Sequence, residues 1–330
     1  MRAVAMRGHG GADVLAVIDA PVPEPGPGEA LVKVSFAGIN FIDIYQRSGT
    51  YSAASKPTPQ APIILGLEGA GEIVKVGTGV SDLKPGERVA WSGSPGSYAE
   101  FARVPAWKLV PVPADVPLDI ACAVQLQGGT AHYLATSTFP LKSGDVALVH
   151  AAAGGVGQLL VQLAKVCGAT VIATVGSDAK AELAKARGAD HVIVYTREDF
   201  LARVLEITAN QGCHVVYDSV GKATLAKSIA ATRRRGLVIS YGNASGVPDA
   251  PSPMALADAG SLFFTRPRLG DYMQDATEIR SRIGDLLQGV RSGALKVTID
   301  RIWPLAEARQ AHETLEARGS HGKLLLKAIG

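Results

Sequence analysis

The chain has 330 residues, 47% of them hydrophobic and 19% charged, with a formal net charge of +3. These values are typical of a globular protein, and the length allows two domains with separate cores. The near-balanced charge argues against a strongly basic nucleic-acid binder. The densest basic cluster, residues 233–235, is interpreted as cations that close a helix before the next strand.

The cysteine pattern and the first residues indicate the compartment. The three cysteines, Cys122, Cys167 and Cys213, show no C-x-x-C spacing and are too few for a disulfide framework. A reducing environment is therefore favoured. The N-terminal residues lack the apolar stretch of a signal peptide, so we expect a cytoplasmic protein with no membrane partner.

Residues 1–120 are predicted to form mainly strands and turns. Strands are expected at residues 3–6 and 31–36, with a proline-rich surface connection between them. Residues 40–47 should form a short helix, capped by Asn40 and ended by Gly49. Residues 51–62 are polar and proline-rich and should form a loop. Glycines within residues 63–76 suggest bent strands that close a small barrel, followed by strands at 89–91, 98–104 and 108–110.

From about residue 124 the pattern changes to strands alternating with helices. Residues 146–149 form an apolar run typical of a buried parallel strand, residues 151–157 a turn of small residues, and a helix begins near Val156. Further strands are expected at 170–175, 191–194, 214–217, 237–241 and 261–264, and helices at 178–187, 197–210 and 222–232. Six strands with helical crossovers are the number found in a complete dinucleotide-binding sheet.

The turn of small residues is a candidate phosphate-binding unit. Its pattern is Ala152-x-Gly154-x-x-Gly157, with alanine at the first glycine position of the usual fingerprint. Such a turn lets the backbone approach a pyrophosphate, and the helix N-terminus supplies free N–H donors. The alternatives are a strand–helix turn without a ligand or a membrane span, and the polar residues within the run argue against the span. His150, beside the turn, is expected to pack in the core.

After residue 266 the alternation stops. A helix is expected at 275–290, a strand at 297–302, a helix at 305–318 and a strand at 324–327. These elements are too few to form a core alone. We therefore predict that residues 1–123 and 266–330 form one domain, into which a nucleotide-binding domain of residues 124–265 is inserted, with the active site in the cleft between them.

The motifs, in this order, resemble those of the zinc-free medium-chain dehydrogenases/reductases, in the quinone oxidoreductase (zeta-crystallin-like) family and close to its bacterial NADPH:quinone reductases. The resemblance rests on AGINFIDIYQRSGTY (37–51), LGLEGAGEIVKVG (65–77), the fingerprint (144–165), VVYDSVG (215–221), RRGLVISYGNASG (234–246) and SLFFTRPRL (261–269). It implies an α/β protein with a GroES-like β-rich catalytic domain and an inserted Rossmann domain, which is a doubly wound parallel sheet.

The zinc sites of related enzymes are not expected in this chain. Zinc-bearing relatives place a cysteine early in the catalytic domain and a His-Glu pair in a Gly-His-Glu motif. The corresponding stretches here are residues 37–40, without cysteine, and Gly66-Leu67-Glu68. Leucine cannot ligate a metal, and the chain has no cluster of cysteines for a structural site. Glu68 is therefore interpreted as a buried, paired carboxylate, and no metal is predicted.

The expected cofactor is NADPH. NAD-specific sheets usually end the second strand with an acid that binds the ribose hydroxyls, but residues 174–177 contain none. Asp178, one step further, is interpreted as a helix N-cap. The resemblance places Ser177, Lys180, Tyr195 and Arg318 around the 2′-phosphate, a set of cations and hydroxyls that suits a phosphomonoester. The alternative for Lys180 is a solvated helix cation.

The resemblance also implies the remaining site residues. Asn40, Tyr45 and Tyr51 would lie where a quinone stacks over the nicotinamide, although aromatic residues there could instead serve domain packing. The other residues implied to bind the cofactor are Phe41, Asp43, Gly128, Thr130, Ala153, Gly154, Gly155, Val156, Gly157, Gly176, Ser219, Tyr241, Gly242, Asn243, Phe264, Thr265 and Arg266.

We therefore predict a zinc-independent NADPH:quinone oxidoreductase that passes reducing equivalents from nicotinamide C4 to a quinone. No Ser/His/Asp arrangement and no general acid is evident, but a hydroquinone can take protons from solvent. One alternative is reduction of activated C=C bonds in 2-alkenals or enoyl thioesters, with Tyr51 or Tyr45 as proton donor. Another is a non-enzymatic, crystallin-like protein that binds NADPH or RNA. By resemblance only, a homodimer is expected through residues 261–264.

Overall fold

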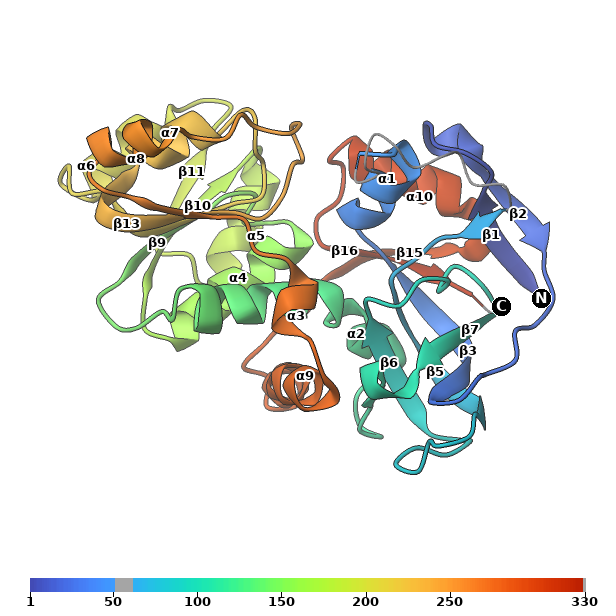
Figure 1. Cartoon of the computed structure of the whole chain (residues 1–330). Coiled ribbons are helices and arrows are strands. Elements are labelled where there is room, and N and C mark those ends of the chain that lie inside the picture. Colours follow the sequence, from blue (N-terminus) through green and yellow to red (C-terminus); the bar gives the residue numbers. More distant parts are fainter. Residues whose placement is uncertain (51–61, 329–330) are drawn as a thin grey trace. The chain divides into compact units, whose positions relative to one another are not determined.

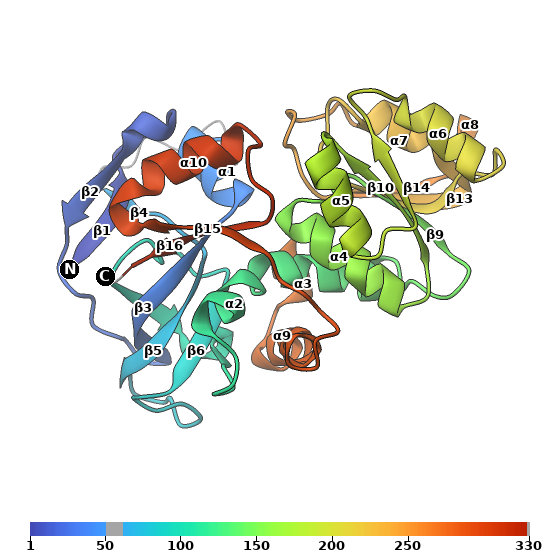
Figure 2. The ribbon, with the colours of Figure 1, turned by 180° about the vertical axis from the view of Figure 1, so that it is seen from behind.

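The computed structural model describes residues 1–50 and 62–328. The chain forms two compact units: a discontinuous unit of residues 1–129 and 273–330, and a continuous unit of residues 130–272. Figures 1 and 2 show the ribbon from opposite sides. None of the helices in the described ranges has the length and apolar character needed to cross a bilayer. The run that suggested a span is a strand, a turn and a helix of 12 residues.

The discontinuous unit is built on β-sheets. In its larger sheet the strand order is β15-β16-β3-β5-β6-β8, with β7 also paired to β3, and a smaller sheet has the order β2-β1-β4. The strands are β1 (Arg2–Met6), β2 (Leu15–Asp19), β3 (Glu29–Ile39), β4 (Ile63–Ile64), β5 (Glu68–Val76), β6 (Arg88–Ser92), β7 (Phe101–Pro105), β8 (Val110–Pro111), β15 (Ile299–Pro304) and β16 (Lys323–Lys327). Because β16 pairs antiparallel with β3, the C-terminal segment completes the N-terminal sheet.

The helices of this unit are α1 (Phe41–Ser48), α2 (Leu118–Ala123), α9 (Ala276–Arg291) and α10 (Ala308–Glu316), and α3 (Leu126–Tyr133) begins in this unit and ends in the continuous one. The predicted short helix is confirmed: Asn40 caps α1 from an extended conformation, and Gly49 ends it at φ 80°. The strand expected at 108–110 begins only at Val110, because residues 106–108 form a 3-10 turn. β2, α2 and α3 were not predicted, since their short segments carry no clear periodicity.

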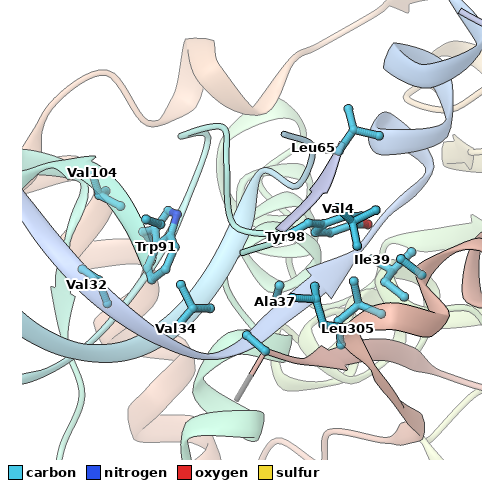
Figure 3. Packing of buried hydrophobic residues seen from close by; sticks show 14 of the residues in the cluster. Val4, Val32, Val34, Ala37, Ile39, Leu65, Trp91, Tyr98, Val104 and Leu305 are labelled. Atoms are coloured by element: carbon cyan, nitrogen blue, oxygen red, sulfur yellow. The ribbon is translucent and has the colours of Figure 1, made fainter. Parts of the chain in front are cut away.

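Apolar side chains of several strands meet in one core in this unit. Trp91 of β6 is fully buried, together with Val32 and Val34 of β3 and Val104 of β7. Tyr98, between β6 and β7, is equally buried in this cluster (Figure 3). Alternating residues of β3 point to the same face, so this strand contributes repeatedly to the core.

The continuous unit is a parallel sheet with the strand order β11-β10-β9-β12-β13-β14. Its strands are β9 (Val146–Val149), β10 (Thr170–Val175), β11 (His191–Val194), β12 (Cys213–Asp218), β13 (Thr232–Ser240) and β14 (Phe263–Thr265). The predicted doubly wound sheet is confirmed. The strand order reverses between β9 and β12, and ligands of such sheets bind beyond the carboxyl ends of the strands at this point.

Helices cover both faces of this sheet: α4 (Gly155–Val166) and α5 (Asp178–Ala186) lie on one face, and α6 (Phe200–Ile207) and α7 (Leu225–Ala230) on the other (Figures 1 and 2). A further short helix, α8 (Pro253–Asp258), precedes β14. The interpretation of residues 233–235 was wrong. They lie within β13, which begins two residues after the end of α7 and earlier than its apolar part suggests.

Candidate functional site

The glycine-rich turn has the geometry of a backbone cradle. β9 ends at Val149, and α4 begins at Gly155 with Gly154 as its extended N-cap. A Cβ atom at Gly157 would overlap the carbonyl oxygen of Ala151 and come within 2.7 Å of Ala152 Cα, so only glycine fits there. The first N–H groups of a helix have no intrahelical partner. The turn, which includes Ala153, Gly155 and Val156, can therefore present N–H donors to an anion.

Several polar side chains lie at the ends of β10 and β11. Ser177, not Asp178 as predicted, caps α5, and its Oγ accepts a hydrogen bond from the Lys180 backbone N–H. Serine and aspartate are comparable N-caps, so spacing alone did not separate them. Both oxygens of Asp178 instead accept from Arg197, at 2.9 and 2.6 Å.

Tyr195 completes this corner. A Cβ atom on Gly176 would lie only 2.7 Å from the Tyr195 hydroxyl oxygen. The absence of a side chain at Gly176 therefore makes room for the phenol. Tyr195 is 47% exposed. The continuous unit thus places Gly176, Ser177, the Lys180 backbone and the Tyr195 hydroxyl close together, and their role at the 2′-phosphate stays a prediction.

Two loops beyond β12 and β13, residues 219–224 and 241–246, pair with each other and are called the platform below. Ser219 O accepts from Ala244 N at 3.2 Å, Val220 O from Ser245 N at 2.8 Å, and Gly246 O from Lys222 N at 3.1 Å. The platform contains the predicted residues Ser219, Tyr241, Gly242 and Asn243.

The strand next to the platform supports it. Arg266 follows β14 and donates to Ser240 O and Gly242 O, both at 3.0 Å. Phe264 packs in a small cluster with Leu225, Val238 and Leu262. Phe264 and Thr265 pair with β13, so they support the platform from the adjacent strand.

In the discontinuous unit, Asn40 is the centre of a buried polar cluster. Its side-chain amide donates to Glu68 Oε2 at 2.9 Å, and its Oδ1 accepts from Lys323 Nζ at 2.7 Å and from Gln127 Nε2 at 3.2 Å. Glu68 also accepts from the Leu126 backbone N–H at 2.6 Å and forms an ion pair with Lys323. Asn40 is itself buried. The cluster therefore joins the start of α1 to the start of α3, which carries Gly128.

The interpretation of Glu68 as a buried, paired carboxylate is confirmed. Its side chain is 0% exposed and that of Lys323 1%. A Cβ atom at Gly38 would overlap Glu68 Oε2 and lie 2.9 Å from Lys323 Nζ, so the ion pair fills the space beside this glycine. Across residues 1–50 and 62–328, no three His, Cys, Asp or Glu side chains are grouped so that they could hold a metal ion.

Asp43 lies where it cannot contact a cofactor, because it has no exposed surface. Its Oδ2 accepts from the Asn40 backbone N–H at 2.8 Å and from the Tyr98 hydroxyl at 3.3 Å. Burial raises the pKa of Asp43 to about 7, although the bond from Asn40 acts in the opposite direction. Its predicted role as a cofactor contact is therefore replaced by a role in holding Asn40.

A buried chain continues from Tyr98. The Tyr98 hydroxyl lies 3.0 Å from His312 Nε2, and His312 Nδ1 lies 3.2 Å from Arg47 Nη1. Burial, with a further contribution from the Arg47 charge, lowers the pKa of His312 to about 3. Because the guanidinium can only donate, Nδ1 accepts and Nε2 carries the hydrogen that His312 donates to Tyr98.

These two pKa shifts predict an unusual pH dependence. Between pH 4 and 6.5 the folded state binds an extra proton at Asp43 and the unfolded state one at His312, so their effects on stability cancel. In His312→Gln only the Asp43 effect remains. Its unfolding free energy relative to wild type should fall by about 1.4 kcal/mol per pH unit as the pH rises through this window. Urea unfolding at pH 4.5, 5.5 and 6.5 measures this.

The exposed His191, replaced by glutamine, is the control for loss of an imidazole. A difference between His312→Gln and wild type that does not change with pH would show that Asp43 does not take up a proton on folding.

The other predicted residues lie as follows. Tyr45 is half-buried, with its ring 6.0 Å from that of Phe41 on the same helix. Gly128 and Thr130 are buried on α3. Arg318 is exposed and follows α10 at φ 56°. Tyr51 lies outside the described residues. His150 is buried in the core as expected, at 1% exposure.

Sequence reasoning missed several residues of this site. Lys323 and His312 contact Asn40 and Tyr98 from the C-terminal segment, and no local pattern indicates those pairings. One signal was available: Lys323 begins the apolar strand β16, and Asp218 ends the apolar strand β12. A charged residue at the end of a buried strand needs a partner, which marks both as candidates.

Comparison with known proteins agrees with this architecture. The model of the "Alcohol dehydrogenase GroES-like domain" matches residues 26–114, and that of the "Zinc-binding dehydrogenase" matches residues 155–279. A quinone oxidoreductase of Pseudomonas aeruginosa is 42% identical, with 96% of this chain and 97% of that protein aligned. A 2-haloacrylate reductase of a Burkholderia species is 40% identical, with 96% of each covered.

The crystal structure of Escherichia coli quinone oxidoreductase complexed with NADPH has a TM-score of 0.95 to this chain. It is 39% identical, with 99% of this chain and all of that one covered. A GroES-like β-rich unit with a Rossmann unit is the architecture of a medium-chain dehydrogenase/reductase, and the predicted fold class is confirmed. Within that class, the chain belongs to the quinone oxidoreductase family.

Proposed function

We propose that this protein is an NADPH-dependent oxidoreductase whose substrates are quinones and which needs no zinc. The observation that carries the cofactor assignment is the phosphate corner at the ends of β10 and β11. Ser177 Oγ accepts from the Lys180 backbone N–H, the Tyr195 hydroxyl lies beside Gly176, and the nearby acid, Asp178, is already paired with Arg197. That set suits a 2′-phosphate better than a 2′-hydroxyl.

The chain's own groups fit the rest of NADPH. The Gly157 turn lets the pyrophosphate approach the N-terminus of α4, and the platform offers backbone with little side-chain volume to the nicotinamide end. When bound, NADPH supplies a hydride from nicotinamide C4. The protein's part is to orient that carbon and the acceptor, because a quinone reduced by hydride can take its proton from solvent.

The cofactor assignment predicts the effect of Lys180→Ala. A charge-assisted hydrogen bond contributes about 1.5–3 kcal/mol, so NADPH binding should weaken roughly 10- to 100-fold. NADH binding should barely change, because NADH lacks the phosphate. Fluorescence titration with both cofactors measures the effect, with Lys185→Ala on the same helix as the matched control, since Lys185 pairs with Glu182. Equal losses for NADPH and NADH would indicate that Lys180 supports the fold instead.

Reduction of an activated C=C bond is the second candidate, and the 2-haloacrylate reductase at 40% identity favours it. Such a reaction must protonate carbon within the site, whereas quinone reduction need not. Tyr45 is a candidate donor on α1, and Tyr51 remains a candidate from the sequence alone.

A homodimer through the edge strand β14 also stays a prediction.

NADPH oxidation against a panel of acceptors distinguishes the two. The panel comprises benzoquinones, naphthoquinones, 2-alkenals, 2-haloacrylates and enoyl thioesters, assayed on chelator-treated protein. We expect a quinone to give the highest kcat/KM and the chelator to have no effect. Faster turnover of a C=C substrate would favour the alternative, and activity restored only by zinc would contradict the metal-free assignment.

A further inference from the structure

Four buried polar side chains form a continuous chain across the carboxyl edge of the parallel sheet. Thr174 Oγ1 on β10 lies 2.8 Å from His150 Nδ1, just after β9. His150 Nε2 lies 3.0 Å from Ser228 Oγ on α7, which donates to Asp218 Oδ2 at 2.7 Å. None of the four is more than 1% exposed. This series of hydrogen bonds thus connects the carboxyl ends of β9, β10 and β12, where the predicted cofactor-binding loops begin.

The donors in this chain all point towards Asp218. Because the Ser228 hydroxyl gives its hydrogen to the carboxylate, Ser228 Oγ accepts from His150 Nε2. Burial lowers the pKa of His150, so the ring is neutral and its Nδ1 accepts from Thr174. This order is not that of a hydrolytic triad, since the serine hydrogen goes to the aspartate and the histidine donates to the serine.

The same carboxylate folds the first loop of the platform. Asp218 Oδ1 accepts from the backbone N–H groups of Val220 and Gly221, both at 2.9 Å. Thr224 Oγ1 donates to the carboxylate as well, at 2.8 Å to Oδ2. Charge-assisted bonds of this kind are about twice as strong as neutral ones. Since residues 241–246 pair with this loop, Asp218 determines the position of both halves of the platform.

We propose that Asp218 is a positioning residue for the nicotinamide half of NADPH, acting through the platform. The inference rests on the proposed cofactor. The Asp218 carboxylate bonds directly to residues 220, 221, 224 and 228 but not to Ser177 or Lys180 of the phosphate corner. Loss of the carboxylate should therefore weaken binding of the whole cofactor more than binding of its adenosine end.

The test compares two ligands in direct titrations that require no turnover. NADPH carries both ends, whereas 2′,5′-ADP carries the adenosine with its 2′- and 5′-phosphates but not the nicotinamide half. Asp218→Asn should weaken NADPH binding roughly 10- to 100-fold, since the amide cannot accept all the donors around it. Binding of 2′,5′-ADP should stay within about twofold of wild type.

Asp145→Asn is the matched control. Asp145 is also buried and accepts a backbone hydrogen bond, from Lys142 N–H at 3.0 Å, but it lies just before β9, at the opposite edge of the sheet. A general loss of stability in this unit would affect both variants. Only Asp218→Asn should change the ratio of NADPH to 2′,5′-ADP affinity.

Should Asp218→Asn fail to fold, Gly242→Ala tests the same platform. A Cβ atom there would overlap Ser219 O and lie 2.9 Å from Ser219 Cα, so it would spread the two loops without touching Asp218. The same ligand selectivity is expected. Equal losses for both ligands, or unchanged NADPH affinity in a folded variant, would overturn this inference but would leave the proposed cofactor intact. A wild-type protein that binds no NADPH would overturn the proposed cofactor and, with it, this inference.

Discussion

Lys323→Met is expected to lower the free energy of unfolding by about 3–5 kcal/mol, because it leaves the Glu68 carboxylate buried without its counter-charge. Glu68→Gln should have a loss of similar size, since it leaves the ammonium group buried. In the double variant Glu68→Gln/Lys323→Met neither charge remains, so most of the stability should return. Urea unfolding of the four proteins measures these differences.

Activity should not recover with stability in the double variant. Asn40 Oδ1 accepts from Lys323 and its amide donates to Glu68, so a methionine leaves the asparagine without its cation. We therefore expect kcat/KM of the double variant to stay low although its stability is restored. The exposed pair of Lys75 and Glu24 is the control, and Lys75→Met should lose less than about 1 kcal/mol. A similarly small loss for Lys323→Met would contradict the buried ion pair.

Gly157→Ala should damage both the fold and cofactor binding. The added Cβ overlaps the turn backbone, and overpacking of this kind typically costs about 1–3 kcal/mol. The displaced turn loses its N–H contacts to the pyrophosphate, so NADPH affinity should fall roughly 100-fold. Thermal unfolding and fluorescence titration report the two effects separately.

Gly154→Ala separates steric damage to the protein from obstruction of the ligand. Among the described residues, a Cβ atom there meets only Ala151 O, at 3.1 Å, and the backbone φ of −76° suits alanine. Its melting temperature should stay close to that of wild type, while NADPH affinity falls because the methyl group lies in the half-exposed turn. Unchanged affinity in this variant would place the pyrophosphate elsewhere.

The sequence predicted those features whose signals are local. The run from β9 through the turn to α4 carries its apolar strand, its small residues and its helical spacing within about 20 residues, and its predicted form is correct. Local signals failed where two neighbouring residues cap helices equally well, as Ser177 and Asp178 do at the N-terminus of α5. The strand β13 begins in a basic stretch, so its first residues resembled a helix end.

Features that depend on distant partners could not be predicted. Glu68 was recognised as buried and paired, but Lys323, its partner, is 255 residues away. The same holds for Arg47 and His312, 265 residues apart. Asp43 was placed against the cofactor by the family resemblance, yet the helical turn carries it inward to Tyr98. Only the folded sheet, with β16 beside β3, brings these groups together.

The pairing of β16 with β3 also has a consequence for biosynthesis. The ribosome releases β3, β5 and Glu68 well before their neighbour β16, because Lys323 follows Glu68 by 255 residues. Residues 130–272, by contrast, form one contiguous unit that is synthesised before β16. The edge of β3 that pairs with β16 and the Glu68 carboxylate therefore lack their native partners until translation delivers that strand.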